Sequence, residues 1–189
     1  MKRLFIIHTE TGKKLSIVYA LRLLAIAVLL LPFASCNDSD EADNAWRDAN
    51  TEAYKKITTN PEYKALKTET GPSGVYYKVI KTGEGTEHPL QTSTVKVLYK
   101  GSYYDGSVFD LGSSLNGVPS EFYLGGGATV RGFSFALQNM VVGDKWEVWI
   151  PDYLGYGETD YYSGYTLMMK GGTTLVFDVE LVSITQFPK

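Results

Sequence analysis

Four sequence blocks within residues 95–182 limit the folds that this chain can adopt, because in them aromatic and β-branched residues alternate with polar ones between glycine-containing turns. The blocks read VKVLYKGSYYDGSVFD, VRGF, WIPDYLGYG and TTLVFDVEL. Such alternation predicts antiparallel strands that each bury one face. The blocks place a set of candidate pocket residues in a fixed chain order: Tyr99, Phe109, Asp110, Val130, Phe133, Tyr156 and Phe177. One carboxylate and two phenols among the apolar side chains of this set suit a dry pocket that holds an apolar group, and they are a poor set for hydrolysis.

The strand signals alternate with turn signals along the chain. Strands are predicted at residues 75–81, 94–100, 108–109, 121–124, 145–150 and 173–185. The Asp105-Gly106 pair predicts a hairpin between the second and third of these strands. Within the same region, only residues 134–140 predict a helix. One short helix among five or six strands indicates the α+β fold class, with an antiparallel β-sheet folded over one short α-helix.

Residues 36–72 are predicted to form a polar tether and a short helical segment ahead of the domain. The stretch 37–43 has too few apolar residues to fold alone. Residues 45–57 are amphipathic, with a narrow apolar stripe and Trp46 beside it; the stripe consists of Ala45, Ala49, Ala53 and Ile57. The simplest interpretation is a helical spacer that packs weakly on the domain, and a dimerisation helix is the alternative.

Residues 1–35 have the composition of a secretory signal peptide. Basic residues precede an unbroken apolar run at residues 23–33, and the small residues Ala34 and Ser35 follow. The apolar run is shorter than the roughly 20 residues that a membrane-spanning helix needs. Cleavage of the segment is therefore predicted, and an uncleaved N-terminal anchor is the alternative.

Cys36 is the only cysteine of the chain, so no disulfide can form within it. A lone cysteine in an exported protein needs an explanation. Its position directly after Ala34-Ser35 resembles the lipobox of bacterial lipoproteins, which implies lipid attachment at Cys36 and anchoring in a membrane by acyl chains. We therefore expect an exported, membrane-anchored lipoprotein that faces the periplasm or the cell surface of a bacterium. A free or buried thiol is the alternative.

The chain becomes strongly acidic once the predicted signal peptide is removed. The whole chain carries 18 basic and 21 acidic residues, and residues 1–35 account for five of the basic and one of the acidic residues. The remaining net charge of −7 argues against nucleic acid as a partner, because nucleic-acid binding needs a basic face. A remainder of about 150 residues fits one domain with a short extra segment. We expect this domain to be a monomer.

The sequence lacks the residue patterns of the commoner hydrolytic and metal-dependent sites. His8 lies in the predicted signal peptide and His88 precedes a proline in a predicted loop, so a Ser–His–Asp or Cys–His arrangement cannot be assembled without strain around the one remaining histidine. No CxxC, HExxH or phosphate-loop pattern occurs, and we expect neither a metal nor a cofactor. A glycosidase-like carboxylate pair drawn from Asp110, Asp152 and Glu158 stays open, although no motif pairs these residues.

Together, the blocks resemble the FKBP-type peptidyl-prolyl cis-trans isomerases over residues 73–184. The most specific signal is LVFDVEL at this distance after IPDYLGYG, and the Phe109-Asp110 pair and VRGF precede it. The resemblance implies a twisted antiparallel sheet wrapped around the short helix, a pocket between them, and proline-containing polypeptides as partners. The predicted organisation is then a lipoprotein signal peptide at 1–35, a tether with a helical segment at 36–72, and an isomerase domain at 73–189.

The resemblance also implies a set of site residues. The catalytic groups would be Asp110, the Tyr156 hydroxyl and the backbone N–H of Val130. The residues that bind the substrate would be Tyr99, Phe109, Phe122, Phe133, Met168 and Phe177. Because most of these aromatic residues fall on predicted strands or on the predicted helix, core packing alone is the alternative explanation for them.

Residues 158–172 depart from the family pattern. The segment is longer than usual, and it carries a set of large apolar side chains: Tyr161, Tyr162, Tyr165, Leu167, Met168 and Met169. A flap rich in methionine can adapt to varied partners, or it can block the pocket. The sequence leaves both alternatives open, and Met168 is the predicted substrate-binding residue of this flap.

Three classes of function are compatible with these patterns. The first is a prolyl isomerase that assists the folding of exported proteins, acting by desolvation and hydrogen bonding without a nucleophile or a metal. The second is a non-catalytic chaperone or binding module of the same fold. The third is a surface lipoprotein that binds glycans through exposed tyrosine and tryptophan side chains, and burial of both Trp146 and Trp149 would argue against it.

Overall fold

The computed structural model describes residues 38–186. The predicted signal peptide and Cys36 lie outside the described residues, as do residues 187–189. The chain divides into two compact units, Met1–Asp40 and Glu41–Lys189, and every described strand belongs to the second. Among the described helices, none is both long and apolar enough to cross a membrane.

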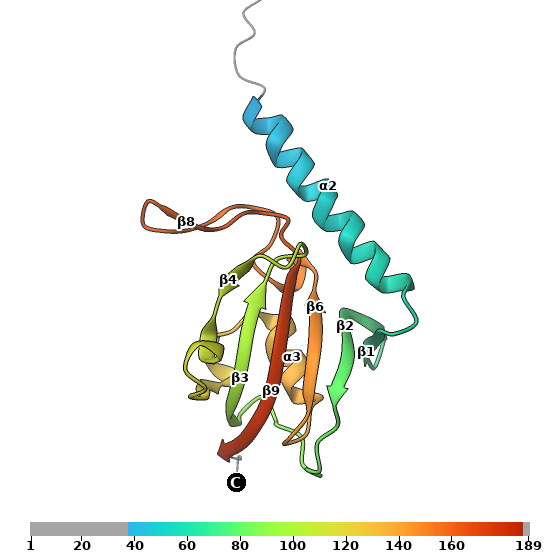
Figure 1. The fold of residues 1–189 in the computed structure, drawn as a ribbon, viewed down its shortest axis with the longest axis vertical. Coiled ribbons are helices and arrows are strands. Elements are labelled where there is room, and N and C mark those ends of the chain that lie inside the picture. Colours follow the sequence, from blue (N-terminus) through green and yellow to red (C-terminus); the bar gives the residue numbers. More distant parts are fainter. Residues whose placement is uncertain (1–37, 187–189) are drawn as a thin grey trace, which may run out of the picture. The chain divides into compact units, whose positions relative to one another are not determined.

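The second unit is built on a seven-stranded antiparallel sheet (Figure 1). Its strands are β1 (Lys64–Thr68), β2 (Gly71–Lys81), β3 (Thr94–Ser102), β4 (Val108–Asp110), β5 (Ser120–Tyr123), β6 (Lys145–Ile150) and β9 (Leu175–Gln186). Their spatial order is β1-β2-β6-β9-β3-β4, and β5 also pairs with β3. The pairing of β3 with β9 runs from Thr94 opposite Gln186 to Ser102 opposite Val176. Residues far apart in the sequence therefore meet along β3.

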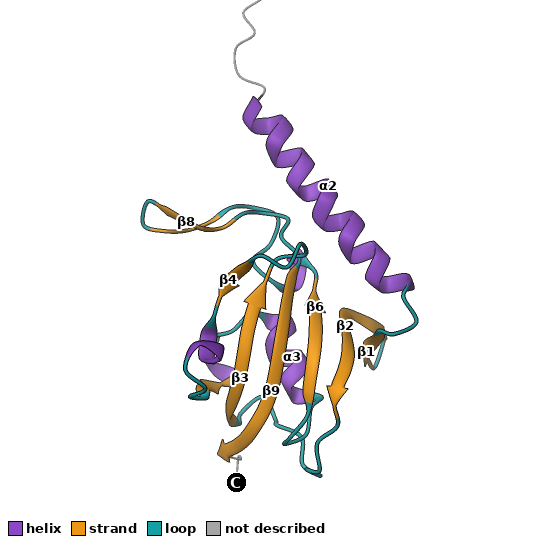
Figure 2. Ribbon diagram, viewed as in Figure 1, coloured by secondary structure: helices purple, strands orange, loops and turns teal. Residues whose placement is uncertain are grey.

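Helices and a small hairpin accompany the sheet (Figure 2). The α-helices in the described part of the chain are α2 (Asp38–Thr59) and α3 (Arg131–Gln138). Short 3-10 helices occur in the connections: η1 (Gly112–Leu115), η2 (Leu124–Gly126) and η3 (Asp152–Leu154). A separate two-stranded sheet is formed by β7 (Tyr161–Ser163) and β8 (Thr166–Met169).

One face of the sheet packs on α3 because buried strand residues alternate with outward-facing ones. The buried cluster on this face includes Val148, Ile150, Leu175, Phe177, Val179 and Leu181 from the sheet and Phe133, Ala136 and Leu137 from α3. The helix approaches the sheet closely, since a side chain at Gly132 would collide with Ile150. The predicted α+β fold, with an antiparallel sheet and one short helix packed on it, is confirmed.

The opposite face of the sheet is partly covered by α2. Trp149 and Val176 fall on the alternate positions of β6 and β9, and they form a second buried cluster with Ile57 of α2. Ala53 of the same helix packs against this cluster. The sheet therefore lies between apolar contacts on both sides at this point.

A buried polar residue helps to hold α2 in place. Asn50 is fully buried, with 0% of its surface exposed. Its Nδ2 donates to the carbonyl of Trp46 at 2.9 Å, and its Oδ1 accepts a hydrogen bond from the N–H of Thr174 at 2.9 Å. The indole of Trp46 donates to Oγ1 of Thr173 at 3.1 Å. Helix α2 is thus docked on the domain by specific hydrogen bonds, in contrast to the weakly packed spacer that the sequence predicted.

The helix also begins earlier than predicted. It starts at Asp38, so the predicted polar tether is largely helical. Acidic residues near this end, among them Asp40 and Glu41, favour a helix because they interact with the positive end of its dipole. The predicted alanine stripe is offset as well, since Ala45 is exposed whereas Asn50 is buried. A hydrophobic pattern does not reveal a buried asparagine.

The sheet takes in residues from the segment that was predicted to precede the domain. Strand β1 lies within residues 36–72, and β2 begins at Gly71 instead of Val75. The pattern does not predict β1, because Leu66 is the only one of its five residues that is buried. A single apolar position is too short a signal for a strand.

Within the domain, most predicted elements are present with shifted ends. Strand β6 matches the predicted range, and the hairpin predicted at Asp105-Gly106 joins β3 to β4. Helix α3 begins at Arg131 instead of residue 134, because the Val130 carbonyl accepts hydrogen bonds from the N–H groups of Phe133 and Ser134.

The predicted flap has a regular structure that the sequence did not indicate. Residues 158–172 contain the β7–β8 hairpin, in which Tyr162 lies opposite Leu167 and Ser163 opposite Thr166. Gly164 takes a φ of 61° in the turn between the strands, a value that favours glycine.

We expect Asn50→Ala to lower the free energy of unfolding by about 1–3 kcal/mol, because it leaves the N–H of Thr174 buried without a partner. Urea unfolding followed by tryptophan fluorescence measures the change. The control is Asp48→Ala, at an exposed position of the same helix, for which we expect a change within about 0.5 kcal/mol. Equal losses in the two variants would show that Asn50 does not hold the helix.

Candidate functional site

A small cavity lies between the sheet, the start of α3 and the loop that follows β6. Its volume is about 80 Å³. The residues that line it are Tyr99, Asp110, Phe122, Ala128, Thr129, Val130, Phe133, Tyr156 and Phe177. Because they come from β3, β4, β5, α3, β9 and two connections, the cavity exists only in the folded domain.

Aromatic rings make up most of the cavity wall. The ring centroid of Tyr99 lies 5.7 Å from that of Phe122 and 5.8 Å from that of Phe133. Phe133 lies 4.6 Å from Phe177 in turn. These separations and tilts are those of favourable edge-to-face and offset aromatic packing. The wall therefore offers a rigid apolar surface to a ligand.

One hydrogen-bonded pair stands among the rings. The hydroxyl of Tyr99 donates to Oδ2 of Asp110 at 2.9 Å, and Oδ1 of Asp110 accepts a hydrogen bond from the N–H of Gly112 at 2.8 Å. Burial, and then the hydrogen bond to Asp110 and its charge, raise the pKa of Tyr99 to about 12. Tyr99 is therefore protonated at neutral pH and holds the carboxylate in one orientation.

The turn after β4 sets the position of Tyr99. The N–H of Tyr99 donates to Oγ of Ser113 at 2.8 Å, and this hydroxyl donates to the carbonyl of Val97 at 3.2 Å. Gly112 has a φ of 46°, and a Cβ atom there would lie 2.6 Å from the Tyr99 ring. The sequence analysis missed both Gly112 and Ser113, whose only signal is their place just after the Phe109-Asp110 pair.

Two donors at the cavity make no hydrogen bond within residues 38–186. One is the N–H of Val130, whose extended backbone (φ −63°, ψ 149°) precedes the first turn of α3. The other is the hydroxyl of Tyr156, a residue that is 41% exposed and whose ring centroid lies 5.1 Å from that of Tyr161. Burial, and then the charges of Tyr161 and Asp110, raise the pKa of Tyr156. Its hydroxyl is therefore available as a donor at neutral pH.

The structure brings most of the predicted site residues together. The predicted catalytic residues Asp110, Val130 and Tyr156 line the cavity, as do Tyr99, Phe122, Phe133 and Phe177 from the predicted substrate-binding set. Ala128 and Thr129 also line it, and the sequence analysis missed them. Their only signal is that they directly precede the VRGF block.

Two predicted substrate-binding residues do not line the cavity. The ring of Phe109 packs 5.8 Å from Phe177 and 5.2 Å from Tyr103. Phe109 packs against the core cluster next to the cavity, at a point where the register of β4 on β3 shifts, and it supports Phe177 from outside the cavity wall. Met168 lies on β8, where 52% of its surface is exposed.

The hairpin does not block the cavity. None of the residues that line it comes from β7 or β8. The two features meet through the contact of Tyr161 with Tyr156. The hairpin therefore stands next to an open cavity, and most of its own side chains are exposed.

Two of the alternatives drawn from the sequence lose their basis in the structure. Trp146 and Trp149 are both buried, so neither can stack on a glycan. Asp152 and Glu158 line a different cavity from Asp110, so no carboxylate pair forms at the aromatic cavity. Across the described residues, no group of three histidine, cysteine, aspartate or glutamate side chains is placed to hold a metal ion.

Residues 85–182, just over half of the chain, match the family model of the FKBP-type peptidyl-prolyl cis-trans isomerases. The chain therefore belongs to the family of FKBP-type peptidyl-prolyl cis-trans isomerases. The matched residues include the whole aromatic cavity.

Similar proteins cover different parts of the chain. The chain is 43% identical over 112 residues to the FKBP-type 22 kDa peptidyl-prolyl cis-trans isomerase of Escherichia coli K12, covering 59% of this chain and 50% of that protein. It is 34% identical over 152 residues to FkpA of the same strain, covering 80% of this chain and 50% of FkpA. The chain thus spans about half the length of these two curated relatives.

Solved structures also match the fold. The crystal structure of FkpA from Escherichia coli matches with a TM-score of 0.64 at 27% identity, covering 98% of this chain and 76% of that one. A peptidyl-prolyl cis-trans isomerase from Pseudomonas syringae pv. tomato matches with a TM-score of 0.62 at 29% identity, covering 76% of this chain and 96% of that one. These likenesses support the fold described above.

We expect the free energy of unfolding to fall as the pH rises from 10 to about 12, because unfolded tyrosine loses its proton near pH 10 while folded Tyr99 keeps its proton up to about 12. The contribution of Tyr99 is fully present below pH 10. Tyr99→Phe should make the decline shallower, and part of it should remain because burial also raises the pKa of Tyr54 and Tyr63. Urea unfolding at several pH values measures the slope.

The matched control is Tyr123→Phe, which removes a hydroxyl from an exposed residue of β5. An unchanged slope in Tyr99→Phe would contradict the link between Tyr99 and alkaline stability. The same change of slope in both variants would contradict it as well.

Proposed function

We propose that this chain catalyses cis–trans isomerisation of the peptide bond before proline in polypeptide substrates. Family membership supports this activity, and one observation carries it: the Tyr99–Asp110 pair lies at the wall of an otherwise apolar, aromatic cavity. The reaction breaks no covalent bond, so it requires no nucleophile.

The energetics of the peptide bond explain why such a cavity is sufficient. Rotation about the C–N bond meets a barrier of about 18–20 kcal/mol because the bond has partial double-bond character. For X–Pro, the two isomers differ by only about 0.5–1 kcal/mol, so a catalyst has only to lower the barrier. The twisted transition state has lost amide resonance and is less dipolar than the planar ground state. An apolar surface therefore favours the twisted state.

Each group at the cavity can take a part in this reaction. The phenylalanines of the wall would hold the proline ring. The N–H of Val130 and the hydroxyl of Tyr156 would donate hydrogen bonds to substrate carbonyls. Asp110, oriented by Tyr99, would face the rotating amide with its negative charge. A million-fold acceleration would require about 8 kcal/mol of differential stabilisation.

A protease-coupled proline-peptide assay on the chain tests this proposal. We expect turnover well above the uncatalysed rate. Asp110→Asn should lower kcat/KM at least about tenfold, because a hydrogen bond to a charged group contributes about 1.5–3 kcal/mol. Tyr156→Phe should lower it about fivefold, as expected for a neutral hydrogen bond. Tyr123→Phe, outside the cavity, serves as the control and should have no effect.

A non-catalytic binding module is the second candidate, and the β7–β8 hairpin favours it. Tyr162, Leu167 and Met168 expose apolar surface on this hairpin, and exposed apolar patches mark interaction sites. A pure holding function would suppress aggregation of an unfolded protein, and Asp110→Asn and Tyr156→Phe would leave that suppression unchanged. Absence of turnover together with such suppression would replace the isomerase proposal by this one.

We further propose that the chain is a bacterial lipoprotein that assists the folding of exported proteins, facing the periplasm or the cell surface. The predicted signal peptide and the lipobox-like position of Cys36 support this location. Proline isomerisation takes about 10–100 s at 25 °C and can limit folding. A catalyst anchored at the membrane would meet exported chains while they fold.

We expect the full chain, expressed in a bacterium, to appear in the membrane fraction with an acylated N-terminal cysteine, and Cys36→Ser to abolish both properties. The reason is that two or more acyl chains anchor a protein stably. Fractionation and mass spectrometry of the N-terminal peptide measure the outcome. Ser39→Ala is the control. Recovery of Cys36 inside an unprocessed peptide would rule out lipid attachment.

A further inference from the structure

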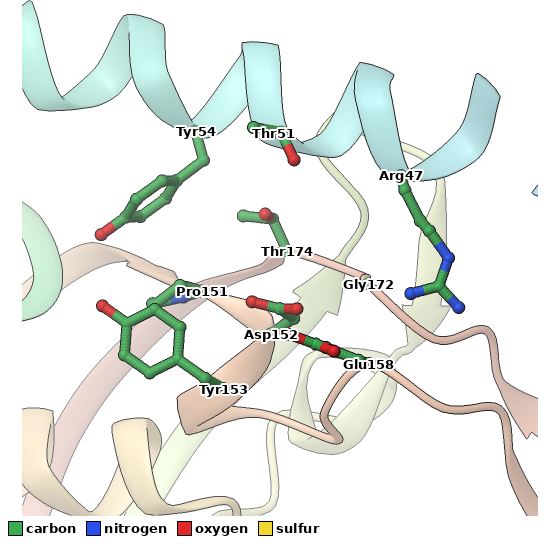
Figure 3. A pocket seen from close by; sticks show the side chains of 9 residues that line it. All are labelled: Arg47, Thr51, Tyr54, Pro151, Asp152, Tyr153, Glu158, Gly172 and Thr174. Atoms are coloured by element: carbon green, nitrogen blue, oxygen red, sulfur yellow. The ribbon is translucent and has the colours of Figure 1, made fainter. Parts of the chain in front are cut away.

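A second and larger cavity lies beside α2 (Figure 3). Its volume is about 340 Å³, compared with about 80 Å³ for the aromatic cavity. The residues that line it are Arg47, Thr51, Tyr54, Pro151, Asp152, Tyr153, Glu158, Gly172 and Thr174. None of these residues has a part in the isomerase proposal above.

Charged groups line this cavity without a partner in the described part of the chain. Asp152 and Glu158 supply carboxylates that form no ion pair and accept no hydrogen bond there, and the guanidinium of Arg47 is likewise unpaired. In Figure 3 Arg47 lies at one end of the cavity and the tyrosines at the other, with both carboxylates between them. The lining therefore has a formal charge of −1, which favours a cationic ligand.

Two tyrosines form the end of the cavity opposite Arg47. The hydroxyl of Tyr54 donates to the carbonyl of Gly74. Gly74 has a φ of 90°, and its missing side chain leaves room for the hydroxyl of Tyr153. Aromatic faces beside carboxylates are the surroundings that an ammonium or guanidinium group favours.

One loop connects the two cavities. Tyr156 lines the first cavity and Glu158 lines the second, so their Cα atoms are at most about 7.6 Å apart. The side chain of Arg131, next to Val130, donates to the carbonyl of Tyr153 at 2.6 Å and ties this loop to α3. An extended polypeptide advances about 3.3 Å per residue. A substrate with its proline in the first cavity would therefore reach the second with residues about two to four positions away.

We propose that the cavity beside α2 binds a lysine or arginine side chain of the polypeptide substrate, about two to four residues from the proline. This inference rests on the proposed isomerase function. Asp152 and Glu158 attract the cation, and the tyrosine rings contact its stem and its charged end. The positive charge of Arg47 would repel a second cation, so we expect the cavity to bind one cation at a time.

Proline peptides that carry Lys, Gln or Glu at each of the four positions on either side of the proline test this specificity with the full chain. At the best position we expect kcat/KM to be up to about fivefold higher for Lys than for Gln, which is the upper end of the effects measured for exposed ion pairs. The Glu peptide should be the poorest of the three. The preference should shrink when NaCl is raised from about 0.05 M to about 0.5 M, because salt screens exposed charges.

Substitutions can distinguish the effect of this cavity on substrate preference from the effect of surface charge in general. The double variant Asp152→Asn, Glu158→Gln should bring the Lys-to-Gln ratio close to one, and Arg47→Gln should raise it. The Asp152→Asn change retains the backbone carbonyl that accepts hydrogen bonds from the N–H groups of Gly155 and Gly157. The matched control is Asp48→Asn, which removes an exposed carboxylate of α2 outside the cavity and should leave the ratio unchanged.

Equal kcat/KM values for the three peptides, or a preference for Glu produced by Arg47, would overturn the inference while leaving the isomerase activity in place. If no peptide is turned over, the proposed function fails. Fluorescence anisotropy of labelled Lys and Gln peptides then measures their binding to the chain, which tests the cation site independently of catalysis. Tighter binding of the Lys peptide, lost in the double variant, would support the site. Equal binding would overturn it.

Discussion

The pairing of β3 with β9 is the interaction on which the other features of the domain rest. It pairs Ser102 with Val176 and Thr94 with Gln186. The pairing therefore requires that the intervening chain, residues 103–175, form a long loop whose two ends meet. Closing such loops costs entropy, which burial of the apolar sheet face on α3 must offset. Strands β4 and β5 add to β3, and β6 adds to β9. Tyr99 and Phe177 are diagonal neighbours in this pairing, and their ring centroids lie 6.3 Å apart at the cavity.

The aromatic cavity is an extension of the hydrophobic core. Phe133 and Phe177 are buried core residues and also line the cavity, so core packing and site formation are the same property for them. Dense packing keeps such rings in place, which makes the wall rigid. A carboxylate is tolerated beside them because Asp110 accepts hydrogen bonds from Tyr99 and Gly112.

Helix α2 turns a surface of the domain into a second cavity. Its buried Asn50 joins it to Thr174, and Arg47, Thr51 and Tyr54 follow one another on a neighbouring face at spacings of four and three residues. The stem of Arg47 lies over Gly172, where a Cβ atom would be 2.7 Å from its Cγ. The charged lining of this cavity therefore depends on how the helix is docked.

The amino-acid sequence alone was sufficient for the strand alternation of β6 and β9, the turn at Asp105-Gly106 and, through the family resemblance, the fold class and most of the residues at the aromatic cavity. Alternation and turn chemistry are local properties, so they are visible in a linear pattern. The buried role of Asn50, the placement of Phe109 outside the cavity and the second cavity itself emerged only in three dimensions. They depend on strand register and on contacts between residues distant in the chain, which no local pattern specifies.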